Sequence, residues 1–341
     1  MKVIVLIYIS DISNIEEFIS IIKEKSFLAR ILCRIIKSKK LKNIIKKIVY
    51  KIYLRKKFYY IKEDTILMYG IKVNLINIIY NKRNLDKLIL ELSKKNVKNI
   101  VLSKKLKENK ELINKLREKN IRVIDGRILY EVLIESMVDY IFKVQNANIH
   151  DSQITFLIKQ NTKQRENTIE ELTKKFKITN IVSDNKSKFT SLRNRLKLDY
   201  GIILNVVENA VNVVKNSDII INYDTEEIKD LAFKKGSIII NIDSKEKIDS
   251  NYFSGINIRD YEIYIPDENR DFYKKYQNKF DISNIYESIC VYEGLTMNEI
   301  KKKSIFDNLS IKYFIGNYGK ISGRELINII VNKYYEKAWQ I

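Results

Sequence analysis

The chain has 341 residues, of which 45% are hydrophobic, so it is long enough for two folded domains and too apolar for a disordered protein. Its 63 lysines and arginines outnumber 42 acidic residues and give a net charge of +21. One histidine and two distant cysteines leave few ligands for zinc and argue against a disulfide framework. The composition therefore favours a reduced, cytoplasmic protein, and no apolar run approaches the length of a bilayer span.

The first part of the chain alternates between strand and helix patterns. The β-branched run over 2–9 predicts a buried strand, and a helix pattern follows over 15–25. After residue 66 the segments IKVNLINIIY, NIVLS and IRVID predict strands, separated by the helix patterns NLDKLILELSKKN and ENKELINKLREKN. Because such alternation favours parallel pairing, we expect a smaller α/β domain over 1–128.

Residues 25–62 form a basic block inside this domain, with fourteen lysines and arginines and no acidic residue. Leu41, Ile44 and Ile48 keep helical spacing with lysines on the other face, which predicts an inserted helical segment. The cations expected to form its basic surface are Lys39, Lys40, Lys42, Lys46, Lys47, Lys51, Arg55, Lys56 and Lys57.

Three interpretations of the basic block stay open. Its two-faced helices could lie on an anionic membrane surface, which would place the protein peripherally at the membrane. Its aromatic residues, interleaved with cations, could bind nucleic acid by stacking and phosphate contacts. Alternatively the lysines form a solvated face, because isoleucine, lysine, asparagine and tyrosine are all over-used and share A/T-rich codons.

The second part of the chain has the clearest alternation. Apolar residues in pairs four apart predict a connecting helix over 129–148. The segments ITFLI, ITNIVSDN, IILNVV, DIIINYD and SIIINID predict five strands, and Gly201 and Gly236 stand where intervening helices would end. Short connections favour a doubly wound parallel sheet, so we expect a Rossmann-like domain over 149–248. A mixed, largely helical region over 249–341 is expected to pack back on the first domain.

Three segments of this part resemble the nicotinamide-binding domain of shikimate dehydrogenases and glutamyl-tRNA reductases. They are KITNIVSDNKSKFTSL, ENAVNVVKNSDIIINYD and LAFKKGSIIINID. The order of the parts is also similar: a first α/β domain, a connecting helix, a Rossmann domain and terminal helices. The resemblance implies a Rossmann fold, an NAD(P) cofactor and a small-molecule ligand in the cleft between the domains. It concerns the fold and does not fix the chemistry.

The stretch after the first strand of this domain departs from the family. Such domains carry G-x-G-x-x-G/A there, because bare backbone amides must reach a diphosphate. Here the matching positions are Lys159, Gln160, Asn161, Thr162, Lys163, Gln164, Arg165 and Glu166. Side chains would stand where phosphate oxygens approach, and an acidic residue at the helix start opposes an anion. We therefore predict a degenerate phosphate loop whose side chains cap a helix.

Other residues keep a cofactor site under consideration. Lys159, Lys163 and Arg165 could hold a phosphate by charge in a different geometry, with Asn161 beside them. Asp184, about twenty residues past the turn, stands where such domains carry the acid that binds the ribose. As the alternative, Asp184 or Asn185 caps the next helix.

The catalytic residues of the resembled families, a lysine–aspartate pair or a cysteine nucleophile, match no positions in this chain. The leading hypothesis is a non-catalytic binding or scaffold protein without a cofactor. One alternative is an NAD(P)-dependent oxidoreductase with an atypical phosphate loop. The other is a peripheral membrane or nucleic-acid-associated protein that acts through residues 25–62.

Overall fold

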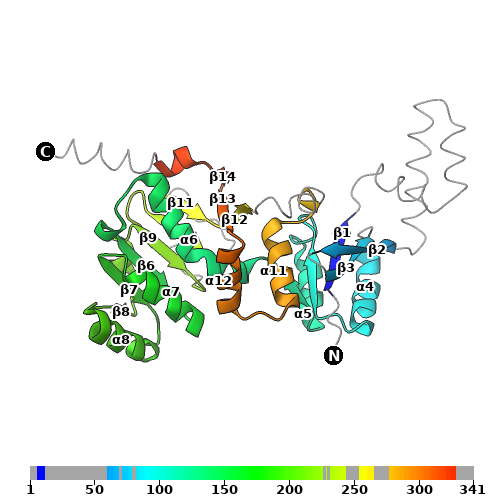
Figure 1. The fold of residues 1–341 in the computed structure, drawn as a ribbon, viewed down its shortest axis with the longest axis horizontal. Helices are drawn as coiled ribbons and strands as arrows, with labels where there is room; N and C mark the ends of the chain where they lie inside the picture. The colour runs from blue at the N-terminus through cyan, green and yellow to red at the C-terminus, as the bar shows by residue number, and fades with distance from the viewer. Residues whose placement is uncertain are drawn as a thin grey trace, which may run out of the picture. The chain divides into compact units, whose positions relative to one another are not determined.

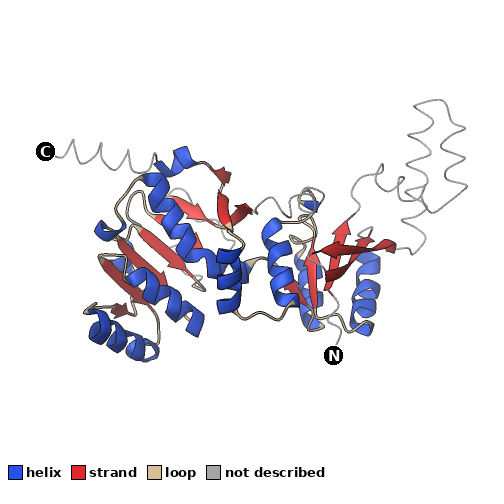
Figure 2. Cartoon of the chain, viewed as in Figure 1, coloured by secondary structure: helices blue, strands red, loops and turns tan. Residues whose placement is uncertain are grey.

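The computed structural model describes residues 6–11, 60–68, 71–78, 82–225, 228, 231–242, 253–264 and 276–327. The chain divides into two compact units, of residues 1–126 with 269–294 and of residues 127–268 with 295–341 (Figure 1). Each unit combines helices with strands (Figure 2). Residues 25–59 of the basic block, including all nine cations of its predicted surface, lie outside the described residues.

The first unit contains a five-stranded sheet. Its strands are β1 (Leu6–Asp11), β2 (Tyr60–Met68), β3 (Ile71–Ile78), β4 (Asn99–Leu102) and β5 (Arg122–Ile124), in the order β2-β3-β1-β4-β5. All pairs are parallel except β2 with β3. Among its described residues the helices are α4 (Lys82–Lys94), α5 (Lys110–Glu118) and α11 (Ile282–Tyr292). Buried residues of α4, α5 and the strands, such as Leu92, Ile100 and Leu116, form one apolar core.

Strand β2 differs from the sequence prediction, which extends helices to residue 62 and contains no strand over 63–68. Its sequence YIKEDTILM has three charged residues in succession, which interrupts the alternation that indicates a strand. Pairing with β3 over its whole length, from Tyr60 opposite Ile78 to Met68 opposite Ile71, forms the strand instead. Tertiary pairing therefore decides this segment.

The second unit contains a six-stranded parallel sheet. Its strands are β6 (Gln153–Leu157), β7 (Ile178–Val182), β8 (Asn205–Val207), β9 (Ile219–Asn222), β10 (Ile238–Asn241) and β11 (Ile256–Ile258). Their order is β11-β10-β9-β6-β7-β8, and every pair is parallel. This is the order of a doubly wound Rossmann-type sheet, so the predicted parallel α/β sheet is confirmed.

The strand order places a reversal between β6 and β9. β6 pairs with β7 on one side and with β9 on the other. The chain runs from β6 through one helix to β7 and then to β8, which lie on one side of β6. It then crosses to β9, which lies on the other side of β6. In open α/β sheets, ligands bind beyond the carboxyl ends of the two strands at such a reversal. Residues 158–162 and 223–225 follow those two ends.

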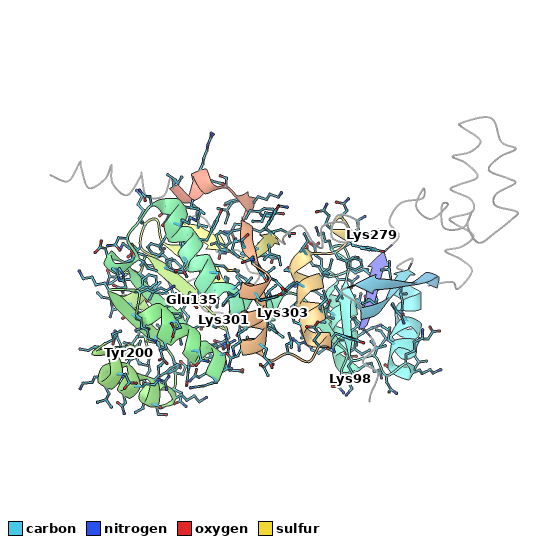
Figure 3. The ribbon with its side chains drawn as sticks, viewed as in Figure 1. Lys98, Glu135, Tyr200, Lys279, Lys301 and Lys303 are labelled. Carbon is cyan, nitrogen blue, oxygen red and sulfur yellow. The ribbon has the colours of Figure 1, made fainter. Side chains whose placement is uncertain are left out.

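The described helices of the second unit include α6 (Arg127–Gln145), α7 (Lys163–Thr173), α8 (Thr190–Tyr200), α9 (Val211–Val214) and α12 (Met297–Phe306). The apolar stripe of α6 is buried, and Gly201 (φ 68°) ends α8, as the sequence predicts. Lys301 of α12 donates to Glu135 of α6 at 2.7 Å, and both are labelled in Figure 3. These two helices are therefore joined by an ion pair.

The helix predicted to end at Gly236 is absent over residues 231–236. Residues 231–234 are not helical, and Gly236 (φ 72°) stands in a turn in which the Ser237 N–H donates to the Lys234 carbonyl at 3.0 Å. Phe233 packs edge-on against Phe253, with ring centroids 5.1 Å apart. The prediction is wrong here because these apolar side chains join the core of the sheet in a non-helical conformation.

A small antiparallel sheet completes the second unit. Its strands are β12 (Asp260–Tyr264), β13 (Ser310–Gly316) and β14 (Gly319–Ile321). The β13–β14 hairpin is missing from the sequence prediction, because only two side chains of β13, Ile311 and Phe314, are buried and the alternation is weak. Within the described residues, no helix is both long and apolar enough to cross a membrane.

Candidate functional site

The turn between β6 and α7 occupies the position of the glycine-rich loop in a dinucleotide-binding domain. Thr162 caps α7, because its Oγ1 accepts from the Arg165 N–H at 3.3 Å. Asn161 Nδ2 donates to Glu166 Oε1 at 2.6 Å and to the Lys188 carbonyl at 3.4 Å. The predicted helix-capping role of this turn is thus confirmed at Thr162.

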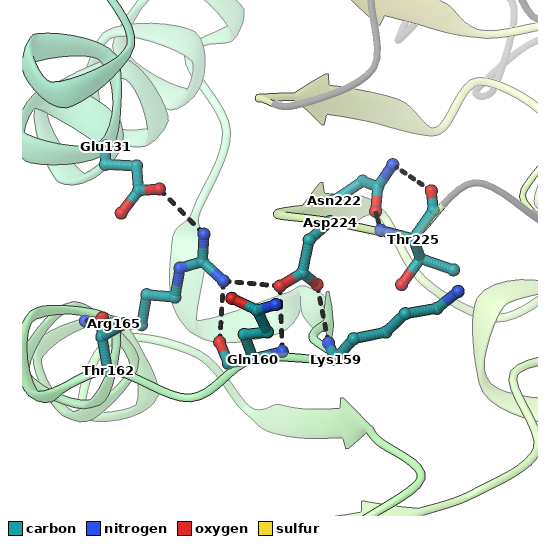
Figure 4. A network of polar contacts seen from close by, with 8 residues as sticks. All are labelled: Glu131, Lys159, Gln160, Thr162, Arg165, Asn222, Asp224 and Thr225. Atoms are coloured by element: carbon teal, nitrogen blue, oxygen red, sulfur yellow. Dashed lines mark hydrogen bonds and ion pairs between the residues drawn. The ribbon is translucent and has the colours of Figure 1, made fainter. Parts of the chain in front are cut away.

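Two successive backbone N–H groups of this turn bind a carboxylate from the neighbouring strand. Asp224, two residues after β9, accepts from the Lys159 N–H on Oδ1 at 2.6 Å. Its Oδ2 accepts from the Gln160 N–H at 2.9 Å (Figure 4). Hydrogen bonds of backbone amides to a charged carboxylate are stronger than those between neutral groups. The amides that open the turn are therefore occupied by an anion of the same chain.

Arg165, in the first turn of α7, binds the same carboxylate. Its Nη1 donates to Asp224 Oδ2 and to the Gln160 carbonyl, each at 2.7 Å (Figure 4). Its Nη2 donates to Glu131 Oε1 of α6 at 2.9 Å. The side chains of Arg165, Asp224 and Glu131 are only 12%, 14% and 18% exposed. We call these three residues the acid–arginine triad.

The guanidinium of the triad stays charged. Burial lowers the pKa of Arg165, but the hydrogen bonds and charges of Glu131 and Asp224 outweigh burial and raise it above its usual value. The guanidinium also lies over the ring of Tyr223, 4.6 Å from its centroid. Burial raises the pKa of the Tyr223 hydroxyl far above its usual value. Both groups keep their protons at neutral pH, so neither is suited to act as a general base.

Asn222, the last residue of β9, fixes the turn that carries Asp224. Its buried side chain accepts from the Thr225 N–H at 3.0 Å and donates to the Thr225 carbonyl at 2.9 Å (Figure 4). The same amide donates to Asn241 Oδ1, at the end of β10, at 3.0 Å. These bonds hold residues 222–225 in one conformation and direct the Asp224 carboxylate to the turn after β6.

The predicted cofactor residues of the turn have different surroundings. Lys159 offers its backbone amide to Asp224, and its side chain is exposed. Asn161 donates to Glu166, at the start of α7, and to the Lys188 carbonyl. The Lys163 side chain is 70% exposed, and its Nζ lies 3.6 Å from Glu166 Oε2. Their part in cofactor binding stays a prediction.

Asp184, the predicted ribose-binding acid, is exposed two residues after β7. The sequence also predicts a helix cap at Asp184 or Asn185, leading into KSKF. Asn185 is the residue before the short 3₁₀ helix Lys186–Phe189, but its side chain makes no capping bond to the backbone. Its Oδ1 accepts from Ser187 Oγ at 2.6 Å instead. The described residues therefore show no side-chain cap at either position.

Sequence reasoning missed Asp224, Glu131 and Asn222. A signal existed for Asp224, because it follows the strand that pairs with β6 at the reversal of the sheet, and Arg165 stands in the matching turn. Glu131 lies among the apolar residues of α6 with no sequence feature that links it to Arg165. Within the described part of the chain, no group of three histidine, cysteine or acidic residues could hold a metal ion.

No family model and no curated protein matches the chain. A solved structure of L-tryptophan dehydrogenase from Nostoc punctiforme is 11% identical in sequence and has a TM-score of 0.29. The matched region covers 88% of this chain and 86% of the dehydrogenase chain. Shikimate 5-dehydrogenase from Listeria monocytogenes, in complex with shikimate and NAD, is 9% identical, with coverages of 89% and 97% and a TM-score of 0.31. A chorismate mutase/shikimate 5-dehydrogenase fusion protein from Clostridium acetobutylicum is 10% identical, with coverages of 90% and 98% and a TM-score of 0.28. Similarity this low carries no argument about the chemistry of this chain.

Proposed function

We propose that this protein has a non-catalytic binding or scaffold role and that its Rossmann-like unit has lost the dinucleotide site. One observation supports this most directly: the Asp224 carboxylate binds the amides of Lys159 and Gln160. In dinucleotide-binding domains, the corresponding turn and helix start face the diphosphate. A negative group of the same chain takes that position here.

A diphosphate would have to displace Asp224 before it could reach these amides. The carboxylate also has an ion pair with Arg165 at 2.7 Å, and both side chains are mostly buried. Separating such a pair costs on the order of 2–4 kcal/mol, which corresponds to roughly a 30- to 1000-fold loss of affinity. The tether gives Asp224 a further advantage, because an intramolecular ligand acts at a high effective concentration.

The test is a titration of the full chain with NADH and with NADPH, followed by nucleotide fluorescence and by thermal unfolding. We expect no saturable change with either nucleotide at concentrations that saturate an ordinary dehydrogenase. Asp184→Ala serves as the site variant. Asp139→Ala, which removes a surface ion pair with Lys175 at 2.8 Å, serves as the matched acid-to-alanine control. Micromolar binding that Asp184→Ala abolishes and Asp139→Ala preserves would overturn the proposal.

A second candidate function is an NAD(P)-dependent oxidoreductase with an atypical phosphate loop. The exposed position of Asp184 beyond β7, the strand beside β6, favours it. In this candidate Asp184 accepts from a ribose hydroxyl, while the exposed ammonium groups of Lys159 and Lys163 bind the diphosphate. Under this candidate function, both the Lys159→Gln/Lys163→Gln variant and the Asp184→Ala variant should lose NADH binding.

The basic block over 25–62 supports a separate proposal, because its fourteen cations have no acidic residue among them. We propose that it contacts an anionic membrane surface. The full chain should sediment with vesicles that contain phosphatidylserine and lose this binding in high salt. A variant with glutamine at Lys39, Lys40, Lys42, Lys46 and Lys47 should stay in the supernatant. If the chain does not bind these vesicles but shifts nucleic acid in a gel, the result would favour the alternative that the basic block binds nucleic acid.

A further inference from the structure

We propose that the outer edge of β8 is a contact surface for a second copy of this chain, and that two copies join their six-stranded sheets there. β8 is the last strand of its sheet, and no other described strand pairs with its outer side (Figure 1). An unpaired strand edge presents a row of N–H and C=O groups that another strand can bind. The inference goes beyond the proposed function and does not depend on it.

The other edge strands of the described sheets have features that discourage such pairing. β2, β5, β12 and β14 contain charged residues, which are unfavourable between paired strands. These residues are Lys62, Glu63, Asp64, Arg122, Asp260, Glu262 and Lys320. β11 has no charge, but Asn257 and Ile258 are buried, and the chain continues into β12, which pairs with β13.

The β8 edge lacks these protections. The stretch 202–207, IILNVV, contains β8 and has neither a charged residue nor a proline, although 31% of the residues of the chain are charged. Asn205, the first residue of β8, is exposed. A short uncharged segment rich in β-branched residues is well suited to pair with another strand.

Large apolar side chains are exposed beside this edge. Leu198 is 82% exposed and Ile203 is 83% exposed, and they lie on either side of Gly201, which ends α8. Ile178, at the start of β7, is 46% exposed and stands level with Ile203 in the parallel register of the two strands. A group of exposed apolar side chains at an unpaired strand edge indicates a contact with another protein chain.

The directions of the backbone groups determine which residues pair. The Ser183 N–H donates to the Val207 carbonyl at 2.9 Å, so the polar groups of residues 205 and 207 face β7. Because this direction alternates along a strand, the N–H and C=O groups of Leu204 and Val206 face outward. Two copies related by a two-fold axis pair their equivalent strands antiparallel. With the axis at Asn205, Leu204 of each copy exchanges both backbone hydrogen bonds with Val206 of the other.

Asn205 ends a hydrogen-bonded row of polar side chains that crosses the sheet. Its Nδ2 donates to Asn180 Oδ1 at 2.8 Å, and Asn180 Nδ2 donates to Thr155 Oγ1 at 3.2 Å. Thr155 Oγ1 lies 2.6 Å from Ser217 Oγ. In the antiparallel pairing the two Asn205 side chains are direct neighbours, and each can donate its second Nδ2 hydrogen to Oδ1 of the other. The row then continues from one sheet into the other.

The same pairing brings opposite charges together at both ends of the contact. It places Glu208 of one copy level with Ile202 of the other. The Ile202 N–H donates to the Leu196 carbonyl at 3.1 Å, so Ile202 lies close to the exposed Lys197. Glu208 is 65% exposed and can approach Lys197 of the second copy. The charges of the rim are therefore complementary between two copies, while the centre is uncharged.

The first test is sedimentation equilibrium of the full chain at increasing concentration. The average mass should rise toward that of two chains, with a Kd on the order of 1–10 μM, because the contact is smaller than a standard interface. Ile203→Lys places a charge on the edge and should weaken association by about tenfold or more. Phe306→Lys is the matched control, because Phe306 is 85% exposed on α12, and it should associate like the wild type.

The second test examines the register by cross-linking. In an antiparallel pair without backbone hydrogen bonds, the two Cα atoms lie about 4.5 Å apart, within the range of a disulfide. Oxidised Asn205→Cys should therefore form a covalent dimer. Tyr318→Cys, at a position 87% exposed on the β13–β14 hairpin, and the wild type with its two native cysteines should stay uncross-linked.

A wild type that stays monomeric at every concentration would overturn the inference and leave the edge to an extended segment of another protein. Association of folded Ile203→Lys as tight as that of the wild type would also overturn it. If Ile203→Lys does not fold, Asn205→Cys decides, because a dimer without cross-linking at this position contradicts the pairing. The proposed function is tested separately, by the titrations with NADH and NADPH.

Discussion

Two strand-to-helix turns of the second unit differ in whether their charged side chains are paired within the chain or exposed to solvent. Beyond β6, a mostly buried arginine and two backbone amides bind Asp224, which follows β9. Beyond β7, Asp184 is exposed, and Lys186 makes a surface ion pair with Glu208 at 3.3 Å. The first turn lies at the reversal of the sheet, and the second lies one strand away from it. Their positions in the strand order account for the difference.

The charged side chains of the two turns differ in burial, and burial decides whether a charge needs a partner. A carboxylate and a guanidinium that are mostly removed from water must satisfy each other, because an isolated buried charge is very unfavourable. The turn after β6 meets this requirement from within the chain. The turn after β7 is solvated, so its acid needs no partner. Substitutions in the first turn should therefore affect stability far more than those in the second.

The largest effect is expected from Arg165→Ala. It leaves the mostly buried Glu131 and Asp224 without their shared cation, so the free energy of unfolding should fall by about 3 kcal/mol. Urea denaturation of the full chain, followed by circular dichroism, measures the change. Lys163→Ala, which removes an exposed pair with Glu166, is the control and should change stability by less than about 0.5 kcal/mol. Equal effects for both variants would contradict the larger contribution expected from the mostly buried ion pairs of Arg165.

A smaller loss is expected from Asp224→Ala, because Arg165 keeps its bond to Glu131. The expected fall is about 2 kcal/mol, since charge-assisted hydrogen bonds are removed and the turn amides can bind water instead. Hydrogen exchange should become faster at the amides of Lys159 and Gln160. Unchanged exchange at these two amides would show that Asp224 does not protect them in solution.

Asn222→Ala should lower stability by about 1–2 kcal/mol. The variant removes the amide that binds the Thr225 backbone and leaves Asn241 without this partner. Because Asn222 positions Asp224, the exchange of the Lys159 and Gln160 amides should increase here as well, by less than in Asp224→Ala. A stability loss with no change at these amides would separate Asn222 from the triad.

The smallest effect is expected from Asp184→Ala, at less than about 0.5 kcal/mol, because the acid is exposed. The same urea denaturation measures it beside Asp224→Ala. A loss as large as that of Asp224→Ala would mean that the turn after β7 depends on its acid for stability. The comparison between the two turns would then fail.

The sequence by itself determined five of the six strands of the parallel sheet in the second unit, whereas β11 lies beyond the predicted domain 149–248. Continuous β-branched runs indicate buried strands, and the order of strands and helices leaves few topologies. The stretch 158–166 contains no glycine, and from this the sequence predicts that a diphosphate lacks its usual backbone approach there. Thr162 as a helix cap follows from local chemistry alone.

Only the tertiary structure decided which groups fill that turn. Asp224 lies 65 positions from Lys159 and meets it because β9 pairs with β6. Glu131 reaches Arg165 from a helix whose sequence pattern records only its apolar face. Strand β2 likewise forms through its partner β3. Local patterns carry no information on such pairings, because long-range contacts depend on strand order and helix packing rather than on neighbours in the chain.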